Sequence, residues 1–370
     1  MTHIFLKYLE TIGPNIGKSL ENLTKSDPNI VFKEHDDLVI FKYKNKYGSE
    51  IERSCRGLIM SKLSKKIVCY SNNGSISFES FIKCVPFDQC VIEENLEGTL
   101  INLYFNNNCW CVSTKFCINA ENSKFRGNKS FRQYFDKLCN IDLQILDPNF
   151  TYSFLLQIPD NRLVSNIDSH QLYHIETLNN ITGEKILLDI GVQKPKILKL
   201  NDLNSLNLKS YRAVNRELVR LDWVKRGYMM FSKDRKHRCS LINPAYETVL
   251  NLIKNQTDIK YIILEGLYYK CNIEDILFYF PEYNNIKIQV SDDLDILVKS
   301  MLESYKEAYC FKNSEVSDIP KKYKKLLARV HSIYKHNHQN NILFRIDYSD
   351  IKATLLKQKC QYVYTILYKS

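Results

Sequence analysis

A run of basic residues near the C-terminal end of the sequence has the residue types and spacing that bind phosphates. The segment Lys321-Lys-Tyr-Lys-Lys325 continues through Arg329 and Lys335, with Tyr323 and Tyr334 between its cations. Such cations neutralise nucleic-acid phosphates, and tyrosine rings offer surfaces on which bases stack. On a helix the two tyrosines would share a face with the apolar residues, leaving the cations outward. A solvated helix surface is the alternative explanation. The candidate nucleic-acid-binding residues are Lys321, Lys322, Lys324, Lys325, Arg329 and Lys335.

Other reactive residue types are scattered along the chain. None of the twelve cysteines belongs to a CxxC pair, and the closest two are Cys109 and Cys111, so zinc knuckles and redox motifs are not expected. His336 and His338 are two residues apart without a carboxylate partner. We therefore predict no metal site. Reduced thiols, together with the lack of a signal sequence at the start, predict an intracellular, cytoplasmic protein.

A second pattern consists of six short segments, each with a glycine, a cation or a polar pair. In chain order they are Ser54–Met60, Glu94–Leu100, Ser113–Lys115, Phe154–Val164, Arg226–Met230 and Ile242–Tyr246. Their order and spacing resemble the lysine-nucleophile nucleotidyltransferase superfamily, and in particular the phage-type RNA ligase 1 family. The resemblance covers about residues 40–250. It implies ATP and Mg²⁺ as cofactors and RNA as substrate.

In that family a lysine amine attacks the α-phosphate of ATP, and AMP then passes from the lysine to an RNA 5′-phosphate. The Lys-x-Asp-Gly signature of the family corresponds here to Asn95-Leu96-Glu97-Gly98. Asparagine has no nucleophilic amine, and no lysine lies between Lys83 and Lys115 to replace it. The resemblance therefore implies a chain that has lost its nucleophile.

Four further catalytic positions differ in the same way. The glutamate that contacts the ribose in the family corresponds to Leu155, and the metal-linked glutamate corresponds to Arg226. The two lysines that hold the α-phosphate correspond to Ser240 and Ile242. With Asn95, five positions are therefore degenerate, and we predict no catalytic residue. Losses among residues that act as a unit do not simply add, and a nucleophile alone accounts for several orders of magnitude in rate.

The remaining matches are predicted to be remnants of a nucleotide pocket. By resemblance they are Arg56, Glu97, Gly98, Lys115 and Arg162. Four of them have an ordinary structural alternative. Arg56 could be an exposed strand-start residue, Gly98 could serve a turn, Lys115 could face solvent, and Arg162 could be an ion-pair partner.

The elements that must position these residues change in type along the chain. Composition is that of a globular protein of two domains, with 370 residues, 44% hydrophobic residues and a net charge of +11. β-branched and aromatic runs predict strands in the first part. They are Leu38–Lys44, Gly57–Met60, Lys66–Tyr70, Thr99–Phe105, Cys109–Lys115, Thr151–Gln157, Leu172–Thr177 and Trp223–Phe231. One surface helix is predicted over Lys129–Cys139.

Helical patterns dominate after Pro244. The predicted helices are Tyr246–Asn255, Asn272–Phe280, Leu294–Tyr309, Lys321–Lys335 and Ile351–Tyr368. We predict an α+β fold, in which an antiparallel-sheet nucleotidyltransferase domain of ATP-grasp-like ligase type (1–250) precedes an all-helical domain (251–370).

Three functions remain open from the sequence. The first is an RNA-ligase-like pseudo-enzyme that binds RNA or nucleotide, with no cofactor in catalysis. The second is an active ATP- and Mg²⁺-dependent RNA ligase with a displaced nucleophile, for which Lys83 and Lys115 are the lysines to test. The third is a structural or interaction protein with a protein partner that reuses the ligase scaffold. No candidate membrane helix is present, because no window approaches 18 continuous apolar residues.

Overall fold

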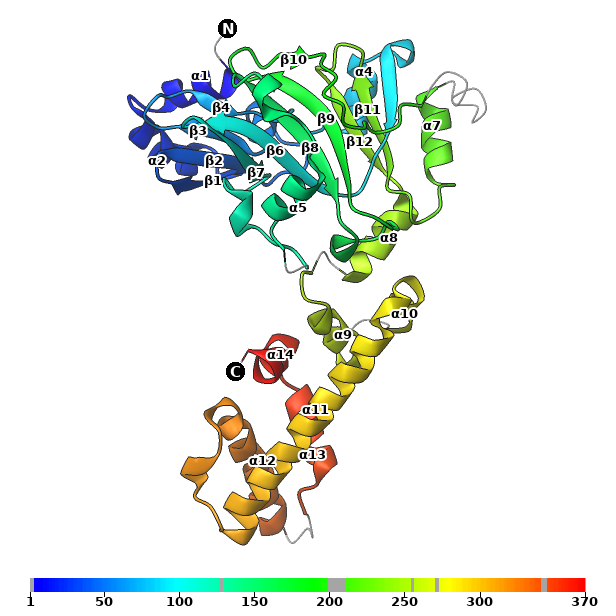
Figure 1. Ribbon diagram of the computed structural model, residues 1–370. Coiled ribbons are helices and arrows are strands. Elements are labelled where there is room, and N and C mark those ends of the chain that lie inside the picture. Colours follow the sequence, from blue (N-terminus) through cyan, green and yellow to red (C-terminus); the bar gives the residue numbers. More distant parts are fainter. Residues whose placement is uncertain are drawn as a thin grey trace. The chain divides into compact units, whose positions relative to one another are not determined.

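The computed structural model describes residues 3–126, 129–198, 210–253, 256–269, 273–340 and 345–369. Contacts divide the chain into two compact units, Met1–Leu250 and Asn251–Ser370, which are described separately (Figure 1). The first unit combines three antiparallel sheets with helices, and the second is helical. The predicted α+β class, with an antiparallel-sheet region followed by a helical region, is confirmed.

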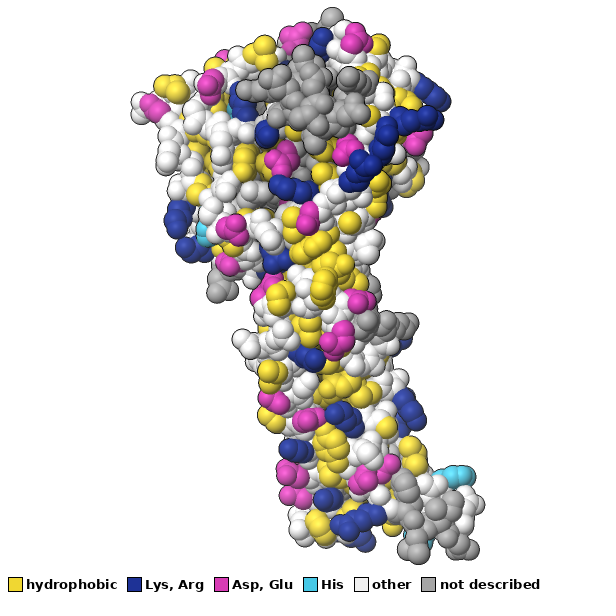
Figure 2. Space-filling view, turned by 90° about the vertical axis from the view of Figure 1, so that its right-hand side faces the viewer, with side chains coloured by type: hydrophobic (Ala, Val, Ile, Leu, Met, Phe, Trp, Pro, Cys, Tyr) yellow, Lys and Arg dark blue, Asp and Glu magenta, His cyan; other side chains and the backbone are white. Residues whose placement is uncertain are grey.

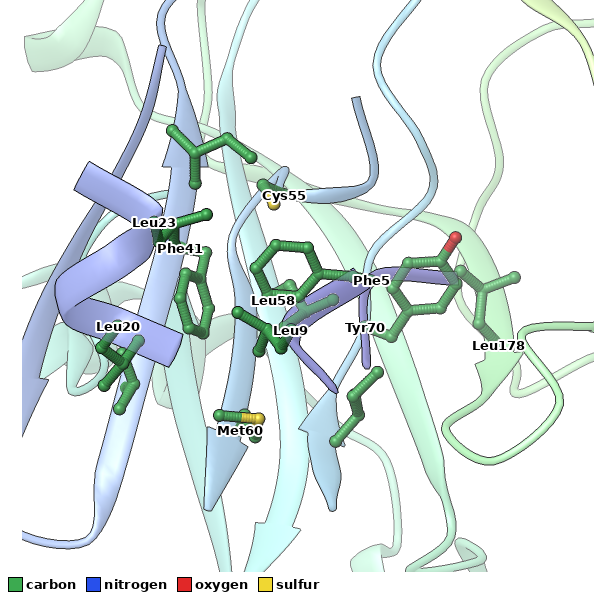
Figure 3. Close-up of a cluster of buried hydrophobic side chains, with 13 residues drawn as sticks. Phe5, Leu9, Leu20, Leu23, Phe41, Cys55, Leu58, Met60, Tyr70 and Leu178 are labelled. Carbon is green, nitrogen blue, oxygen red and sulfur yellow. The ribbon is translucent and has the colours of Figure 1, made fainter. Parts of the chain in front are cut away.

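The first sheet has the strand order β1-β2-β3-β4. Its strands are β1 (Ile30–His35), β2 (Leu38–Tyr43), β3 (Leu58–Ser61) and β4 (Ile67–Cys69). Helices α1 (Ile4–Ile12), α2 (Ile16–Ser26) and α3 (Glu50–Ser54) accompany it. Apolar side chains of α1 and α2, such as Phe5 and Leu23, point toward strand side chains such as Phe41 (Figure 3). This cluster anchors the segment after α3, which contains Arg56.

The second sheet has the order β10-β9-β8-β6-β7. Its strands are β6 (Thr99–Asn106), β7 (Cys109–Thr114), β8 (Phe150–Gln157), β9 (Gln171–Asn179) and β10 (Lys185–Ile186). Residues such as Leu103 and Phe154 pack with helix α5 (Phe131–Leu138) on one face (Figure 1). On the opposite face Asn102 pairs with both Ser113 and Ser153, and all three are buried. This polar face belongs to the side of the sheet that carries Leu155, because residues two apart in a strand share a face.

The third sheet has the order β12-β11-β5 and consists of β5 (Cys90–Glu94), β11 (Gly227–Ser232) and β12 (Arg238–Ile242). Helices α4 (Phe78–Cys84) and α7 (Tyr211–Leu218) supply apolar partners for it. Met229 pairs with Glu93 on one side and with Ser240 on the other. The sequence did not predict β5 or β12, because each is short and mixes polar and apolar residues.

The second unit is built around one long helix. α11 (Asn284–Tyr305) is 22 residues long and continues into a π-helical turn at Lys306–Phe311. Around it lie α9 (Ile259–Tyr268), α10 (Ile273–Tyr279), α12 (Lys321–Gln339), α13 (Tyr348–Leu356) and α14 (Cys360–Tyr368). Helix α8 (Pro244–Ile253) contains the division between the two units. Among the described residues, no helix is both long and apolar enough to cross a membrane.

Several predicted element bounds were wrong. The strand predicted over Trp223–Phe231 begins only at Gly227. The side chain of Asp222 accepts a hydrogen bond from the Val224 amide and its carbonyl accepts one from Lys225, so a turn precedes the strand. The helix predicted over Ile351–Tyr368 is two helices, α13 and α14. Asn255 and Asn272, which the predicted helices included, lie outside the described residues.

Candidate functional site

Three of the five positions that the resemblance marks as degenerate lie together at the third sheet. Asn95 directly follows β5, and its side-chain amide donates a hydrogen bond to Ser240 Oγ at 3.0 Å. The backbone amide of Asn95 donates to the carbonyl of Gly227, so the Arg226–Gly227 segment lies alongside. Arg226 Nη1 in turn donates to the Leu96 carbonyl at 3.1 Å. Asn95 and Ser240 therefore bind each other, and Arg226 binds the backbone next to Asn95.

The other two positions contribute apolar side chains. Ile242 pairs with Gly227 across the third sheet. Leu155 lies against Gly98, where an added Cβ would come within 2.9 Å of Leu155 Cγ and 2.8 Å of the Leu156 carbonyl oxygen. Glycine is required at position 98 because these atoms leave no room for a side chain. The ordinary alternative for Gly98, a structural role, thus has a direct physical cause.

Glu97 is a structural anchor of this region. Its side chain is 3% exposed, and its carboxylate accepts hydrogen bonds from the backbone amides of Leu163, Val164 and Ser165. It also accepts one from the Tyr246 hydroxyl at 2.8 Å. Four protein donors occupy this carboxylate, which explains why an acidic residue persists here without an adjacent lysine. Burial and the charge of Glu97 raise the pKa of Tyr246, so this hydroxyl stays protonated.

Arg162 belongs to the same anchoring segment. Its Nε donates to the Val164 carbonyl at 3.3 Å, and its own carbonyl accepts from Arg126 Nη1 at 2.6 Å. These contacts shape the loop that wraps around Glu97. The structure thus places Arg162 within the scaffold of the site.

Arg56 and Lys115 are brought side by side by a glycine. Gly57 has φ +75°, and a Cβ there would lie 3.1 Å from the Lys115 carbonyl oxygen. The Arg56 guanidinium donates to the side-chain oxygen of Asn72. Besides burial, the charge of Arg226 lowers the pKa of both Arg56 and Lys115, and the charge of Arg238 lowers the pKa of Lys115. We call Arg56, Lys115, Arg226 and Arg238 the cation cluster.

The members of the cation cluster repel one another. Burial, followed by the charges of Arg56, Lys42, Arg238 and Arg226, lowers the pKa of Lys115 to about 8. The side chain of Lys115 nevertheless keeps more than a third of its surface exposed. Burial and the charge of Arg56 likewise lower the pKa of Arg238, partly offset by Glu176.

A catalytic divalent cation does not fit this arrangement. Where the family resemblance places a metal-linked glutamate, the chain has the guanidinium of Arg226 within a cluster of like charges. Among the residues that the structure describes, no group of three His, Cys, Asp or Glu side chains could hold a metal ion. Positive charge near Arg226 opposes Mg²⁺ and favours anions.

The basic candidates of the C-terminal region lie on helix α12. Lys321, Lys325 and Arg329 are exposed and four residues apart, so they share one face of the helix; we call these three the α12 stripe. Lys322 and Lys335 are also exposed, whereas Lys324 is half-buried and its Nζ lies 3.4 Å from the Ser317 carbonyl.

Tyr323 is 3% exposed and packs in the helical core, so the expectation that its ring could stack on bases was wrong. Tyr334 is half-buried and stacks on His331 at 5.8 Å between ring centroids. On the face shown in Figure 2, lysine and arginine side chains of this unit alternate with acidic ones. This face therefore presents charges of both signs rather than a broad basic patch.

Arg238, Asn72 and Glu176 were missed by the sequence analysis. Arg238 lies on β12 two residues before Ser240, so both side chains face the same side of the sheet. That alternation was a usable signal in the sequence. Asn72 and Glu176 gave no such signal, because only the packing of the first and second sheets brings them near Arg238.

Comparison with known proteins points to ligases. No family model matches the chain. It is 22% identical over 288 residues to a protein of Autographa californica nuclear polyhedrosis virus named as a bifunctional polynucleotide kinase/RNA ligase. The match covers 69% of this chain but only 39% of that relative.

Among solved structures, an archaeal ATP-dependent RNA ligase has a TM-score of 0.44 at 8% identity, covering 74% of this chain and 72% of that one. Naegleria gruberi RNA ligase with PPi has a TM-score of 0.37 at 13% identity, covering 50% and 58% respectively. These similar proteins are named as RNA ligases, in agreement with the resemblance that the six segments predicted.

Proposed function

We propose that this chain is an RNA-ligase-like protein that has lost nucleotidyl transfer and retains binding of RNA or nucleotide. The observation that carries this proposal is the pairing of Asn95 with Ser240 at 3.0 Å. At the position where the resemblance requires a reactive amine, an amide is bound to a hydroxyl of the neighbouring strand. Neither group can form a phosphoramidate with AMP.

The surrounding contacts support the same conclusion. A transferred nucleotidyl group needs a nucleophile and charge stabilisation that act together. Here Leu155 and Ile242 provide no polar group, and Arg226 is bound to the Leu96 carbonyl. Restoring one residue would leave the others unsuited to the reaction, because catalytic residues act as a unit.

Incubation with α-labelled ATP and either Mg²⁺ or Mn²⁺ tests the loss of activity. After denaturation we expect no label on the chain. Label that survives denaturation and is released by acid, as a phosphoramidate would be, contradicts the proposal. Adding label to heat-denatured protein controls for adsorption.

A second candidate, an active ligase with a displaced nucleophile, is favoured by one observation. The pKa of Lys115 is lowered to about 8, so about one amine in ten is unprotonated at pH 7. An unprotonated amine is the form that attacks phosphorus. If acid-labile label forms, its loss in Lys115→Ala and its persistence in Lys83→Ala would identify this nucleophile.

RNA binding is assigned to helix α12 in this proposal, because the α12 stripe is exposed and the helix contains no acidic residue. Retention of a single-stranded RNA should weaken steeply with salt, by about 0.7 logarithmic units per phosphate contact and tenfold change in salt. Reversing the three charges of the stripe should flatten that slope.

The matched control for RNA binding reverses three exposed lysines of the same unit, Lys299, Lys357 and Lys359. An equal effect of both triple variants would mean that general charge, not the stripe, retains the RNA. No binding even at low salt would favour a structural or interaction protein with a protein partner instead.

A further inference from the structure

Two cysteines lie side by side on the last strand of the second sheet. Cys109 and Cys111 are two residues apart on β7, so their side chains share one face of the strand. Their sulfur atoms lie 3.7 Å apart. Cys109 is exposed and Cys111 is half-buried. The lack of a CxxC motif argued against a metal site in the sequence, but on a strand a CxC pair also brings two sulfur atoms together.

The hairpin between β6 and β7 holds the two sulfur atoms in place. Asn107 and Asn108 have φ 49° and 58°, as in the tight turns that join antiparallel strands. Asn106 pairs with Cys109, so Cys109 is the first strand residue after the turn. Cys111 packs against an apolar cluster between the first and second sheets. The pair is therefore preformed by the fold.

The separation of the sulfur atoms suits a metal ion better than a disulfide. Two sulfur ligands of a tetrahedral zinc ion, each at about 2.3 Å from it, lie about 3.8 Å from each other. A disulfide needs sulfur atoms about 2.05 Å apart and Cα atoms within about 6.8 Å. Residues two apart in a strand already span about 6.8 Å. Chelation therefore needs little movement, and soft thiolate ligands prefer thiophilic cations.

One chain supplies only half of such a site. Structural zinc sites almost always have four protein ligands. Within the described ranges, no group of three or more His, Cys, Asp or Glu side chains could hold a metal ion. The two missing ligands must therefore come from outside the described part of the chain.

The surroundings of the pair favour a second copy of the chain as their source. β7 is the last strand of its sheet, and no described strand pairs with its outer edge (Figure 1). Exposed edges usually carry charged side chains that oppose association, but no charged residue occurs between Glu97 and Lys115. The guanidinium of Arg132, on the neighbouring helix α5, forms an ion pair with Asp136 at 2.8 Å. The same edge of a second copy would therefore meet little charge repulsion.

We propose that Cys109 and Cys111 of two copies of this chain bind one thiophilic cation of the Zn²⁺ class through four sulfur atoms. A two-fold axis through the ion gives both copies the same contact. Binding leaves four thiolates on the cation and passes the four thiol protons to solvent, with no change of oxidation state. Neither cysteine belongs to the six segments of the family resemblance, and the inference does not depend on the proposed function.

Proton release distinguishes coordination from adsorption. Burial and the neighbouring Cys109 raise the pKa of Cys111 to about 11, and the charge of Arg132 partly offsets this shift. The Cys111 thiol is therefore protonated at neutral pH when no metal ion is bound. A coordinated thiol loses its proton outright. Metal uptake by this pair should therefore acidify a weakly buffered solution.

Titration of the reduced whole chain with Zn²⁺, and with Cd²⁺ as a spectroscopic probe, tests the inference. Cadmium–thiolate bonds absorb in the ultraviolet and so report sulfur ligands, while sedimentation velocity reports the mass. We expect one cation per two chains, and dimers that EDTA returns to monomers. Cys109→Ser should abolish the metal-dependent dimer and weaken binding by more than about tenfold, the loss that even outer groups of a metal site cause.

The matched control replaces two other exposed cysteines, Cys84→Ser together with Cys310→Ser. It removes as many thiols as the double variant Cys109→Ser, Cys111→Ser but leaves the pair on β7 intact. Its metal uptake and its dimer should therefore equal those of the wild type. Thermal melts of each variant without metal show that it folds.

Three results would each overturn the inference. Equal metal uptake by the wild type and the double variant Cys109→Ser, Cys111→Ser would mean that other groups bind the cation. One cation bound per monomer would mean that no second copy is needed. A dimer that forms without metal, or in the double variant, would mean that association has another cause. None of these measurements involves ATP or RNA, so failure of this inference and failure of the proposed function are distinguishable.

Discussion

Replacing Arg238 by methionine should stabilise the protein in the absence of anions. In the wild type two nitrogen atoms of this guanidinium are buried and find no hydrogen-bond partner among the described residues, and Arg56 repels their charge. An unsatisfied buried donor costs about 1–3 kcal/mol, and methionine of similar length removes both donors and the charge. We therefore expect the free energy of unfolding to rise by about 1–3 kcal/mol. For a unit of this size, that corresponds to roughly 2–4 °C in Tm per kcal/mol.

Differential scanning calorimetry with and without phosphate provides the assay. A ligand that binds only the folded state stabilises it by RT ln(1 + [L]/Kd), which is about 2.7 kcal/mol at a hundredfold excess over Kd. Because Arg238 lies among like charges, added phosphate should raise the Tm of the wild type more than that of Arg238→Met. The difference in stability between the two should shrink as phosphate increases. Lys236→Met, which removes an exposed charge of the same hairpin, should follow the wild type in both conditions.

A lower Tm of Arg238→Met without phosphate would refute this reasoning. It would mean that Arg238 contributes to the stability of the apo protein, as part of a structural pair with Glu176 or through its contact with the Phe231 ring. An unchanged response of Tm to phosphate in the variant would mean that Arg238 does not bind the anion, even if the stability change has the expected sign.

Four further predictions concern the scaffold and the charged helix. Burial lowers the pKa of His174 to about 4, so between pH 6.5 and 4 the unfolded state binds more protons than the folded state. The free energy of unfolding should therefore fall as the pH drops through this range, by up to about 2 kcal/mol at pH 5. Urea titrations should show that His174→Gln reduces that loss. Tyr246→Phe removes a hydrogen bond to the buried Glu97 carboxylate and should cost about 1.5–3 kcal/mol of unfolding free energy, whereas an unchanged urea midpoint would mean that Glu97 is satisfied without it. Gly57→Ala, at φ +75° and against the Lys115 carbonyl, should cost at least about 1–2 kcal/mol in the same assay. Charge reversal of the α12 stripe should lower the salt slope of RNA retention by about two units or more if all three cations contact phosphates, measured by filter binding at increasing salt.

Much of the secondary structure followed from local sequence. Strands such as Thr99–Phe105 and Cys109–Lys115 were predicted within one residue of β6 and β7, because β-branched and aromatic residues flank an asparagine-rich turn. A predicted strand bound was wrong at Asp222, where hydrogen bonds between residues close in sequence form a turn within a strand-like pattern. Strands such as β12 were not predicted, because they are short and mix polar and apolar residues.

The sequence by itself determined that Asn95 cannot be a nucleophile and that no lysine lies between Lys83 and Lys115, because the identity of a side chain sets its chemistry. It did not determine what Glu97 does, since the partner Tyr246 is 149 residues away. The same applies to Arg238, whose surroundings come from three sheets, and to Tyr323, whose ring is buried by packing. Only the tertiary structure decided these roles, because burial and hydrogen-bond partners depend on which distant segments pack together.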